Sequence, residues 1–336
     1  MAFLLQQTLI YAVPLMIVAL AGIFAERSGI INLALEGIMI MGAFIGVLVV
    51  YSFQKMGLFT KDAGQLLMLV ALLISAIGGA LFSLLLSFAA INLKADQTIG
   101  GTALNLMAPA LVLFLIYFIT RANTLGMYTG DAASWFMLKK TDFGFSKTAD
   151  LGLLGEIFLH KVYLTTYICI GLYVILSVIL YATKFGLRLR ACGENPQAAA
   201  SLGVNVFHMR YAGTTISGAL AGIGGFTFAL TTANCASTGD VAGFGFLALA
   251  VMIFGNWKPL NTALAALLFG LCKCIAAAYS TIDLNGDGIY MLKELGIDAG
   301  FYRMFPFIIT LVVLVFTASK SRAPKAEGIP YDKGTR

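Results

Sequence analysis

Residues 65–90 read QLLMLVALLISAIGGALFSLLLSFAA, a run of 26 positions that contains no charged side chain. An α-helix of about 20 mostly apolar residues is long enough to cross the hydrocarbon core of a lipid bilayer. The run does not alternate between apolar and polar residues, so it predicts a helix and not a strand of a membrane barrel. This stretch therefore indicates an integral membrane protein.

The composition of the whole chain agrees with this interpretation. Of its 336 residues, 60% are hydrophobic and 11% are charged, whereas soluble domains have roughly 45–50% apolar and about 25% charged residues. A water-soluble enzyme of this size could not bury so much apolar surface, and disordered or fibrous chains are far more polar or proline-rich. The net charge of +6 is more typical of basic cytoplasmic loops than of a nucleic-acid-binding protein.

We predict an all-α polytopic membrane bundle of about nine transmembrane helices, with eight and ten as the alternative counts. The predicted spans are residues 4–25, 31–51, 65–90, 99–120, 162–183, 211–232, 241–256, 261–281 and 304–319. Together they make residues 1–320 a single transmembrane domain, which is followed by a tail over residues 321–336.

The orientation follows from lysines and arginines near the ends of the spans. The loop 184–210 and the tail 321–336 are both basic and are separated by four predicted spans, so both lie on one side. The positive-inside rule makes that side cytoplasmic. The loops 121–161 and 282–303 and the N-terminus are then expected on the extracytoplasmic side.

Motifs for catalysis are absent from the sequence. It has no Walker A pattern, no H-E-x-x-H and no G-x-S-x-G, and its only histidines, His160 and His208, lie far apart. We therefore expect no catalytic residue, and ATP-driven work would need an ATPase on another chain.

The loop 184–210 contains a short helix signal. Asn195 is a typical N-cap, Pro196 suits the first helical turn, and Gly203 is a typical stop. The small residues between them would let another surface approach closely. The pattern predicts a docking helix for a partner, and an ordinary connecting loop is the alternative.

Three motifs carry a resemblance to a known family. RACGENPQAA at 190–199 resembles the coupling loop of ABC importer permeases, including branched-chain amino acid and ribose permeases. ERSGIINLALEG at 26–37, and GFGFLALAVMIFG at 243–255 followed by Lys258 and Pro259, resemble signatures of nucleoside and simple-sugar permeases. The chain is most similar to guanosine-type nucleoside permeases.

This resemblance implies the permease subunit of a type II ABC importer-like system in the bacterial cytoplasmic membrane, carrying nucleosides. It implies three kinds of partner: ABC ATPase subunits, an extracytoplasmic substrate-binding (lipo)protein, and a second permease, identical or different. The residues implied in coupling to the ATPase are Arg190, Glu194, Asn195, Ala198 and Gly203.

Other functions stay open at this point. The first alternative is a permease for simple sugars or branched-chain amino acids. The second is a secondary transporter driven by an ion gradient, which would carry an inverted repeat. No convincing match relates residues 1–160 to 161–336.

Polar and aromatic residues inside the predicted spans are candidates for the substrate pathway, because such residues are costly in lipid. Asn32 and Glu36 share one predicted helix face. For Glu36 the alternative is a bond to a donor on another helix, and for Asn105 it is a helix-to-helix hydrogen bond. Lys273 is expected to snorkel or to pair with a carboxylate such as Glu36. The pathway candidates are Asn32, Glu36, Asn105, Phe226, Asn234 and Phe244.

Small residues recur four positions apart in two of the spans. Gly218 and Gly222 form such a pair, and Gly42 and Gly46 form another. This spacing is typical of membrane helices whose backbones pack closely.

Residues 283–294, DLNGDGIYMLKE, match the calcium-loop pattern D-x-[DN]-x-[DN]-G-x5-E. Calcium is the one cofactor that we consider, and a loop of Asx turns is the alternative. The candidate ligands are Asp283, Asn285, Asp287, the carbonyl of Ile289, and Glu294.

Overall fold

The computed structural model describes residues 2–144, 152, 155, 159, 161–278, 298–317 and 323–333. Within these residues the fold is helical, apart from a short antiparallel pair of strands, β1 Met137–Leu138 and β2 Val162–Tyr163. The helices are α1 Ala2–Arg27, α2 Leu35–Lys55, η1 Lys61–Ala63, α3 Gly64–Ile91, α4 Gln97–Thr120, α5 Ala132–Phe136, η2 Lys140–Phe143, α7 Leu164–Ala182, α8 Lys184–Glu194, α9 Pro196–Ser201, α10 Val206–Thr231, α11 Phe244–Phe254, α12 Pro259–Ala278 and α14 Ala299–Thr317.

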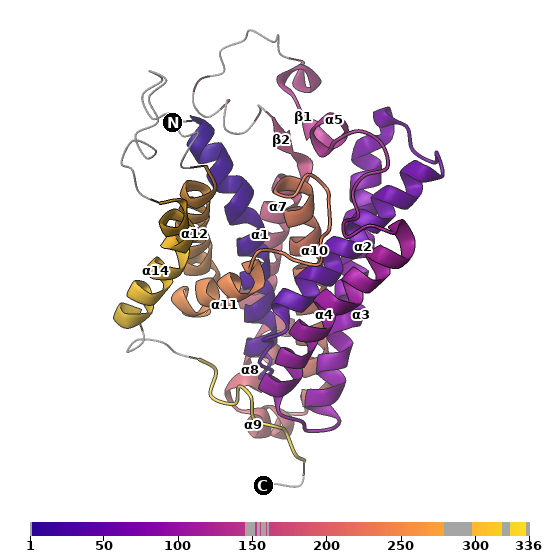
Figure 1. The fold of residues 1–336 in the computed structure, drawn as a ribbon. Helices are drawn as coiled ribbons and strands as arrows, with labels where there is room; N and C mark the ends of the chain where they lie inside the picture. Colours follow the sequence, from indigo (N-terminus) through magenta and orange to yellow (C-terminus); the bar gives the residue numbers. More distant parts are fainter. Residues whose placement is uncertain are drawn as a thin grey trace.

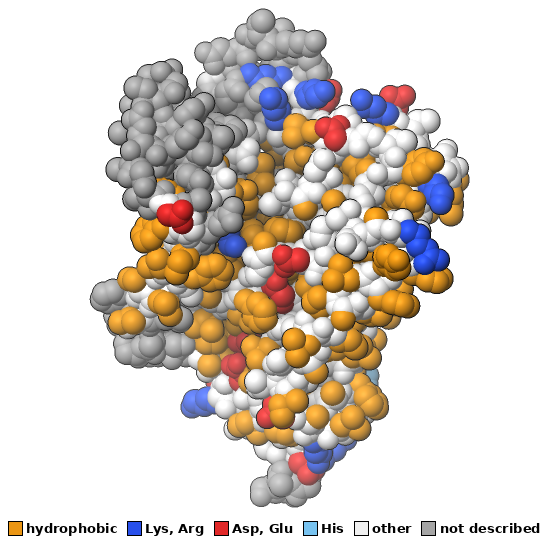
Figure 2. Space-filling model, in the orientation of Figure 1, with side chains coloured by type: hydrophobic (Ala, Val, Ile, Leu, Met, Phe, Trp, Pro, Cys, Tyr) orange, Lys and Arg blue, Asp and Glu red, His pale blue; other side chains and the backbone are white. Residues whose placement is uncertain are grey.

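Seven of these helices are long and apolar enough to cross a membrane, which confirms the predicted polytopic helical membrane fold. They are α1, α2, α3, α4, α7, α10 and α12. The bundle is elongated (Figure 1): β1, β2 and α5 lie at one end, the hairpin end, and α8 and α9 lie at the other, the α9 end. Figure 2 shows hydrophobic side chains over much of the middle of the visible face and basic side chains mostly toward its two ends.

The seventh predicted span, which is short enough that a tilt or a break is expected, is not a complete transmembrane helix. Residues 241–256 contain only α11, which has 11 residues. At 1.5 Å per residue it is about 16 Å long, roughly half the thickness of the hydrocarbon core. The chain nevertheless passes from the hairpin end toward the α9 end here. Asn234 bonds to α5 at the hairpin end, and Trp257 bonds to Glu26 near the last residue of α1. A non-helical segment, residues 232–243, covers the other half of the crossing.

The predicted close packing of small residues forms the centre of the bundle, where α10 lies against α2 and α3. A Cβ atom on Gly42 would come within 2.4 Å of the Cα of Gly222, and one on Gly79 within 2.3 Å of the carbonyl oxygen of Gly218. The hydroxyl of Ser75 lies 2.7 Å from the carbonyl oxygens of both Gly42 and Gly222. These distances show that the three backbones touch, as the glycine spacing predicts.

Residues 323–333 pack along the α9 end, and we call them the C-terminal strap. The N–H of Ala326 donates to the carbonyl of Gly193 over 2.8 Å, and the buried Arg210 donates to the carbonyl of Ile329 over 3.0 Å. The ring of Tyr331 lies 5.4 Å from that of Phe207. The tail and the loop 184–210 therefore lie at the same end of the molecule and in contact.

Candidate functional site

Helix α9 is built by local signals. The side chain of Asn195 accepts a hydrogen bond from the N–H of Ala198 over 3.0 Å, and Pro196 occupies the first turn. Gly203 then takes a positive φ of 81°, which a residue with a Cβ adopts at a cost. The predicted short helix is therefore present, and it ends within one residue of the predicted position.

Helix α9 presents one exposed face and one buried face. Ala198 and Gly203 are exposed, whereas Ala199 is buried beside Cys192 and Val206. Leu202 is 85% exposed, more than any other large hydrophobic residue in the described part of the chain. Leu202 was not among the residues predicted from the sequence, although an apolar residue between an alanine-rich turn and a glycine in a polar loop was a usable signal.

Glu194 and Arg190 are held by this chain's own side chains. The Oε1 of Glu194 lies 3.2 Å from the Nη1 of Arg27, at the end of α1. The guanidinium of Arg190 lies over the ring of Tyr181, 4.6 Å from its centre, and donates to the Tyr181 carbonyl over 3.4 Å. Both charged groups therefore join α8 to neighbouring membrane helices, Glu194 to α1 and Arg190 to α7.

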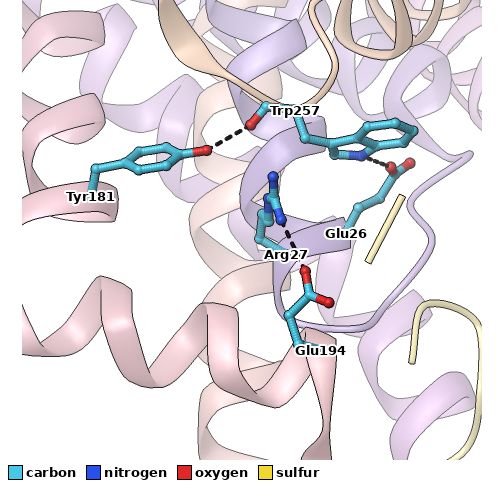
Figure 3. Close-up of polar contacts among 5 residues, drawn as sticks. All are labelled: Glu26, Arg27, Tyr181, Glu194 and Trp257. Carbon is cyan, nitrogen blue, oxygen red and sulfur yellow. Dashed lines mark hydrogen bonds and ion pairs between the residues drawn. The ribbon is translucent and has the colours of Figure 1, made fainter. Parts of the chain in front are cut away.

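A network of polar contacts connects α8, through the end of α1, to the turn that follows α11 (Figure 3). The indole N–H of Trp257 donates to the carboxylate of Glu26, the residue before Arg27. The hydroxyl of Tyr181 donates to the carbonyl of Trp257 over 2.9 Å. Residues from α1, α7, α8 and the turn after α11 thus meet at one point.

The C-terminal strap adds a third carboxyl group, that of Glu327, beside Glu26 and Glu194. Burial raises the pKa of Glu327 to about 7, although its hydrogen bond with Glu26 and the charge of Arg27 act in the opposite direction. The raised pKa means that folding favours the protonated form of this carboxyl more than water does.

Asn32 and Asn105 each donate one hydrogen bond and accept another within the bundle. The amide of Asn32 donates to the hydroxyl of Ser217 over 2.9 Å and accepts from the N–H of Ala34. The side chain of Asn105 accepts from the N–H of Gly37 over 2.8 Å and donates to the carbonyl of Leu33 over 2.7 Å. Both residues therefore hold the entry into α2, and for Asn105 this is the interhelical role that we gave as the alternative. Asn32 precedes α2, so the predicted helix face shared with Glu36 is wrong.

Glu36 binds the first turn of α11. Its carboxylate accepts three backbone N–H groups, those of Gly243 at 3.0 Å, Gly245 at 2.6 Å and Phe246 at 3.2 Å. These N–H groups have no partner within their own helix, and a negative charge is favourable at a helix N-terminus. Glu36 thus ties α2 to α11 and is 7% exposed.

Of the two roles expected for Lys273, snorkelling or pairing with a carboxylate such as Glu36, the described residues show no ion pair with Glu36. The Lys273 ammonium donates to the carbonyl of Ala242 over 3.1 Å and lies over the rings of Phe244 and Phe307, at 5.0 and 5.5 Å from their centres. Lys273 therefore also contacts the start of α11, although through a carbonyl group and aromatic rings.

The remaining pathway candidates lie apart from one another. Phe226 is fully buried against α2, where a Cβ on Gly46 would come within 2.2 Å of its ring. Phe244 is buried and lies 4.6 Å, centre to centre, from the ring of Phe228. Asn234 is exposed at the hairpin end, where it accepts from the N–H of Ala132 over 3.1 Å. The structure therefore brings Glu36 and Phe244 together at α11 and leaves Phe226 and Asn234 elsewhere.

The candidate calcium loop 283–294 lies outside the described residues, so it stays a prediction. Among the residues that the structure describes, no group of three or more His, Cys, Asp or Glu side chains is placed to hold a metal ion.

Comparison with known proteins gives a consistent set of relatives. A family described as "Branched-chain amino acid transport system / permease component" matches residues 4–314. The guanosine ABC transporter permease protein NupQ of Bacillus subtilis is 38% identical over all of this chain and 98% of the relative. The nucleoside ABC transporter permease protein NupC of Lactococcus lactis is 38% identical over 97% of this chain and 95% of the relative.

A more distant relative carries a different printed substrate. The putative glucose ABC transporter permease protein TsgC13 of Haloferax volcanii is 25% identical over 96% of this chain and 93% of the relative. No solved structure matches the chain.

Proposed function

This chain belongs to the family of branched-chain amino acid transport system permease components, and from that premise we propose that it carries nucleosides as the membrane subunit of an ABC importer. It is a multi-pass protein of the cell membrane. The observation that carries the substrate class is the 38% identity, over essentially the whole chain, to two permeases whose names specify guanosine or nucleosides.

The chain itself is a permease subunit and not an enzyme, since ATP hydrolysis in such transporters belongs to a partner chain. In our proposal the ATPase receives α9. Two features support this role, the exposed Leu202 and the exposed face of Ala198 and Gly203. An apolar side chain presented on a short rigid helix can insert into a cleft of a partner.

The contacts behind α9 suggest how motion of the ATPase reaches the membrane helices. Movement of α8 acts on α1 through Glu194 and Arg27. The adjacent Glu26 acts on the turn after α11 through Trp257, and α11 is held at its other end by Glu36 of α2. ATP binding can drive transport only if it stabilises one arrangement of these helices over another.

The complete importer in this proposal contains three further kinds of partner. Two ATPase subunits lie on the α9 end, which is then cytoplasmic, and a substrate-binding protein docks on the hairpin end. A second permease, identical or different, completes the transmembrane part. This arrangement agrees with the basic residues of the loop 184–210.

Transport of a simple sugar is the second candidate function. It is supported by the archaeal relative whose printed name specifies glucose, although the identity is 25%. Uptake of radiolabelled guanosine, adenosine, ribose and glucose by cells with and without the gene tests both. We expect the deletion to abolish nucleoside uptake, and loss of sugar uptake with intact nucleoside uptake would contradict the proposal.

A further inference from the structure

The segment between α10 and α11 enters the middle of the bundle without forming a helix. Its hairpin end is fixed by Leu125 and Ser237, whose N–H and carbonyl groups bond to each other over 3.0 and 2.8 Å. Farther along, Gly239 lies against α4, where a Cβ would meet Leu113 at 2.9 Å and the carbonyl oxygen of Pro109 at 3.4 Å. Pro109 and Leu113 are near the centre of α4, so Gly239 lies near the middle of the membrane.

Several groups at this depth face outward. Asp240 and Ala242 are exposed, and Phe246 in the first turn of α11 is 53% exposed. Figure 2 shows acidic side chains at mid-height on this face, among hydrophobic ones. A charged side chain at this depth is costly in hydrocarbon. Backbone that is not helical is tolerated at membrane depth only where protein covers it or where it lines a water-filled cavity.

The rest of the described chain does not cover Asp240, so we infer that residues 238–246 line the water-filled route of the transported molecule and that Asp240 contacts this molecule during passage. This inference rests on the proposed transport function and extends it to a residue and a recognition chemistry. Of residues 238–246, only Phe244 was among the pathway candidates predicted from the sequence.

The surrounding charges indicate which molecules suit this position. Glu36 and Lys273 are charged groups that interact electrostatically with Asp240. The carboxylate of Glu36 accepts three N–H groups of α11, and the ammonium of Lys273 donates to the Ala242 carbonyl and lies over two rings. The Oδ1 of Asp240 accepts from the N–H of Ala242 over 3.0 Å, which leaves acceptor capacity on its other oxygen. An ionised carboxylate only accepts hydrogen bonds, so it suits a molecule with N–H or O–H donors.

A nucleoside has such donors on its ribose and on its base, whereas a phosphorylated nucleotide would be repelled by the carboxylate. The route at this point therefore favours neutral, donor-rich molecules over anionic ones. We expect Asp240 to determine specificity between these classes.

Thiol labelling tests whether Asp240 faces water. The importer, with all its subunits, is placed in lipid nanodiscs and treated with a charged methanethiosulfonate reagent. The five native cysteines are buried, so their background is low. Asp240→Cys should react at least about tenfold faster than Ile175→Cys, because only an ionised thiol reacts and hydrocarbon suppresses ionisation. Ile175 is a matched control, since it is 58% exposed near the middle of α7.

Nucleoside uptake tests whether the substrate meets Asp240. Asp240→Asn keeps the size of the side chain and should lower the uptake rate by roughly tenfold, the effect of losing a hydrogen bond to a charged group. Asp62→Asn, at an exposed aspartate of η1, is the control that should transport normally. Copurification of the partner subunits with each variant verifies assembly. Added nucleoside should also slow the labelling of Asp240→Cys.

The outcomes separate this inference from the proposed function. Equal labelling of Asp240→Cys and Ile175→Cys would overturn the water-filled route. Rapid labelling without protection by nucleoside, together with normal uptake by Asp240→Asn, would overturn the contact with the substrate while nucleoside transport stands. If the wild-type importer carries a sugar and not a nucleoside, the proposed function is wrong. The water-filled route past Asp240 would still stand if that sugar slowed the labelling of Asp240→Cys.

Discussion

Arg27, the last residue of α1, lies 3.2 Å from Glu194, the last residue of α8, and this ion pair joins two positions 167 residues apart in the sequence. The side chain of Arg27 is 14% exposed and that of Glu194 is 47% exposed. Ion pairs with this much solvent contact contribute about 0 to 1 kcal/mol to the free energy of unfolding. The pair is therefore better suited to holding α8 in position than to stabilising the fold.

The first prediction concerns this pair. Glu194→Gln should change the free energy of unfolding by less than about 1 kcal/mol, yet it should lower nucleoside uptake because α8 no longer moves with α1. Thermal unfolding of the purified complex and uptake by cells measure the two effects. Glu194→Arg should be more harmful, and Arg27→Glu in the same chain should restore part of the uptake. Unimpaired uptake by Glu194→Gln would remove the coupling role.

The second prediction concerns Leu202. Because this side chain is 85% exposed, Leu202→Ala should leave the thermal stability of the permease unchanged. It should weaken the ATPase complex by roughly 10- to 100-fold, since burying a leucine contributes about 1.5–3 kcal/mol. The dissociation constant of the ATPase measures this effect. Leu58→Ala, at a leucine 62% exposed just beyond α2, is the control, and equal affinities for both variants would contradict the docking role.

The third prediction concerns the glycine contact at the centre of the bundle. Gly42→Ala places a Cβ 2.4 Å from the Cα of Gly222, so α2 and α10 must separate. Overpacking of this kind costs about 1–3 kcal/mol, which should lower the Tm by several degrees. Gly171→Ala on α7 is the matched control, because its Cβ would meet no atom within 4 Å. A Tm as high for Gly42→Ala as for Gly171→Ala would show that the helices do not touch.

The fourth prediction is a pH dependence of the C-terminal strap. The pKa of Glu327 is raised to about 7 in the folded protein from an ordinary value of 4.5, so the folded state binds the proton more tightly. The stability that this group contributes is complete below pH 4.5 and is lost as the pH rises through about 7. Glu26 and Arg27 are the charged groups that face it.

Hydrogen exchange of residues 323–333 measures this effect. The strap should exchange faster at pH 8 than at pH 6, after correction for the intrinsic rate. Glu327→Gln should remove most of the difference and should protect the strap at pH 8. A strap whose corrected exchange is the same at both pH values in the wild-type protein would contradict the raised pKa.

The sequence alone determined the features that depend on neighbouring residues. Uninterrupted apolar runs are sufficient to predict a membrane helix, because each turn must satisfy its own backbone in lipid. The position of α9 is also set locally, by Asn195, Pro196 and Gly203. A helix cap and a helix stop act within one or two turns, so they can be read from the sequence. The spacing of Gly42 and Gly46, and of Gly218 and Gly222, likewise predicts close helix contacts.

Tertiary structure decided the contacts that join distant segments. The sequence left Glu36 either facing the substrate or bonding a donor on another helix, and it could not say which donor. The structure places the carboxylate on the N–H groups of α11, more than 200 positions away. Hydropathy also predicted a full span at 241–256, whereas residues 232–243 complete that crossing without a helix because Glu36, α4 and Lys273 supply contacts for them. Apolar content is a local property, but the partner of a buried polar group depends on which segments the fold brings together. For this reason hydropathy predicted the bundle, and only the packed helices placed Asp240 at mid-depth on an open face.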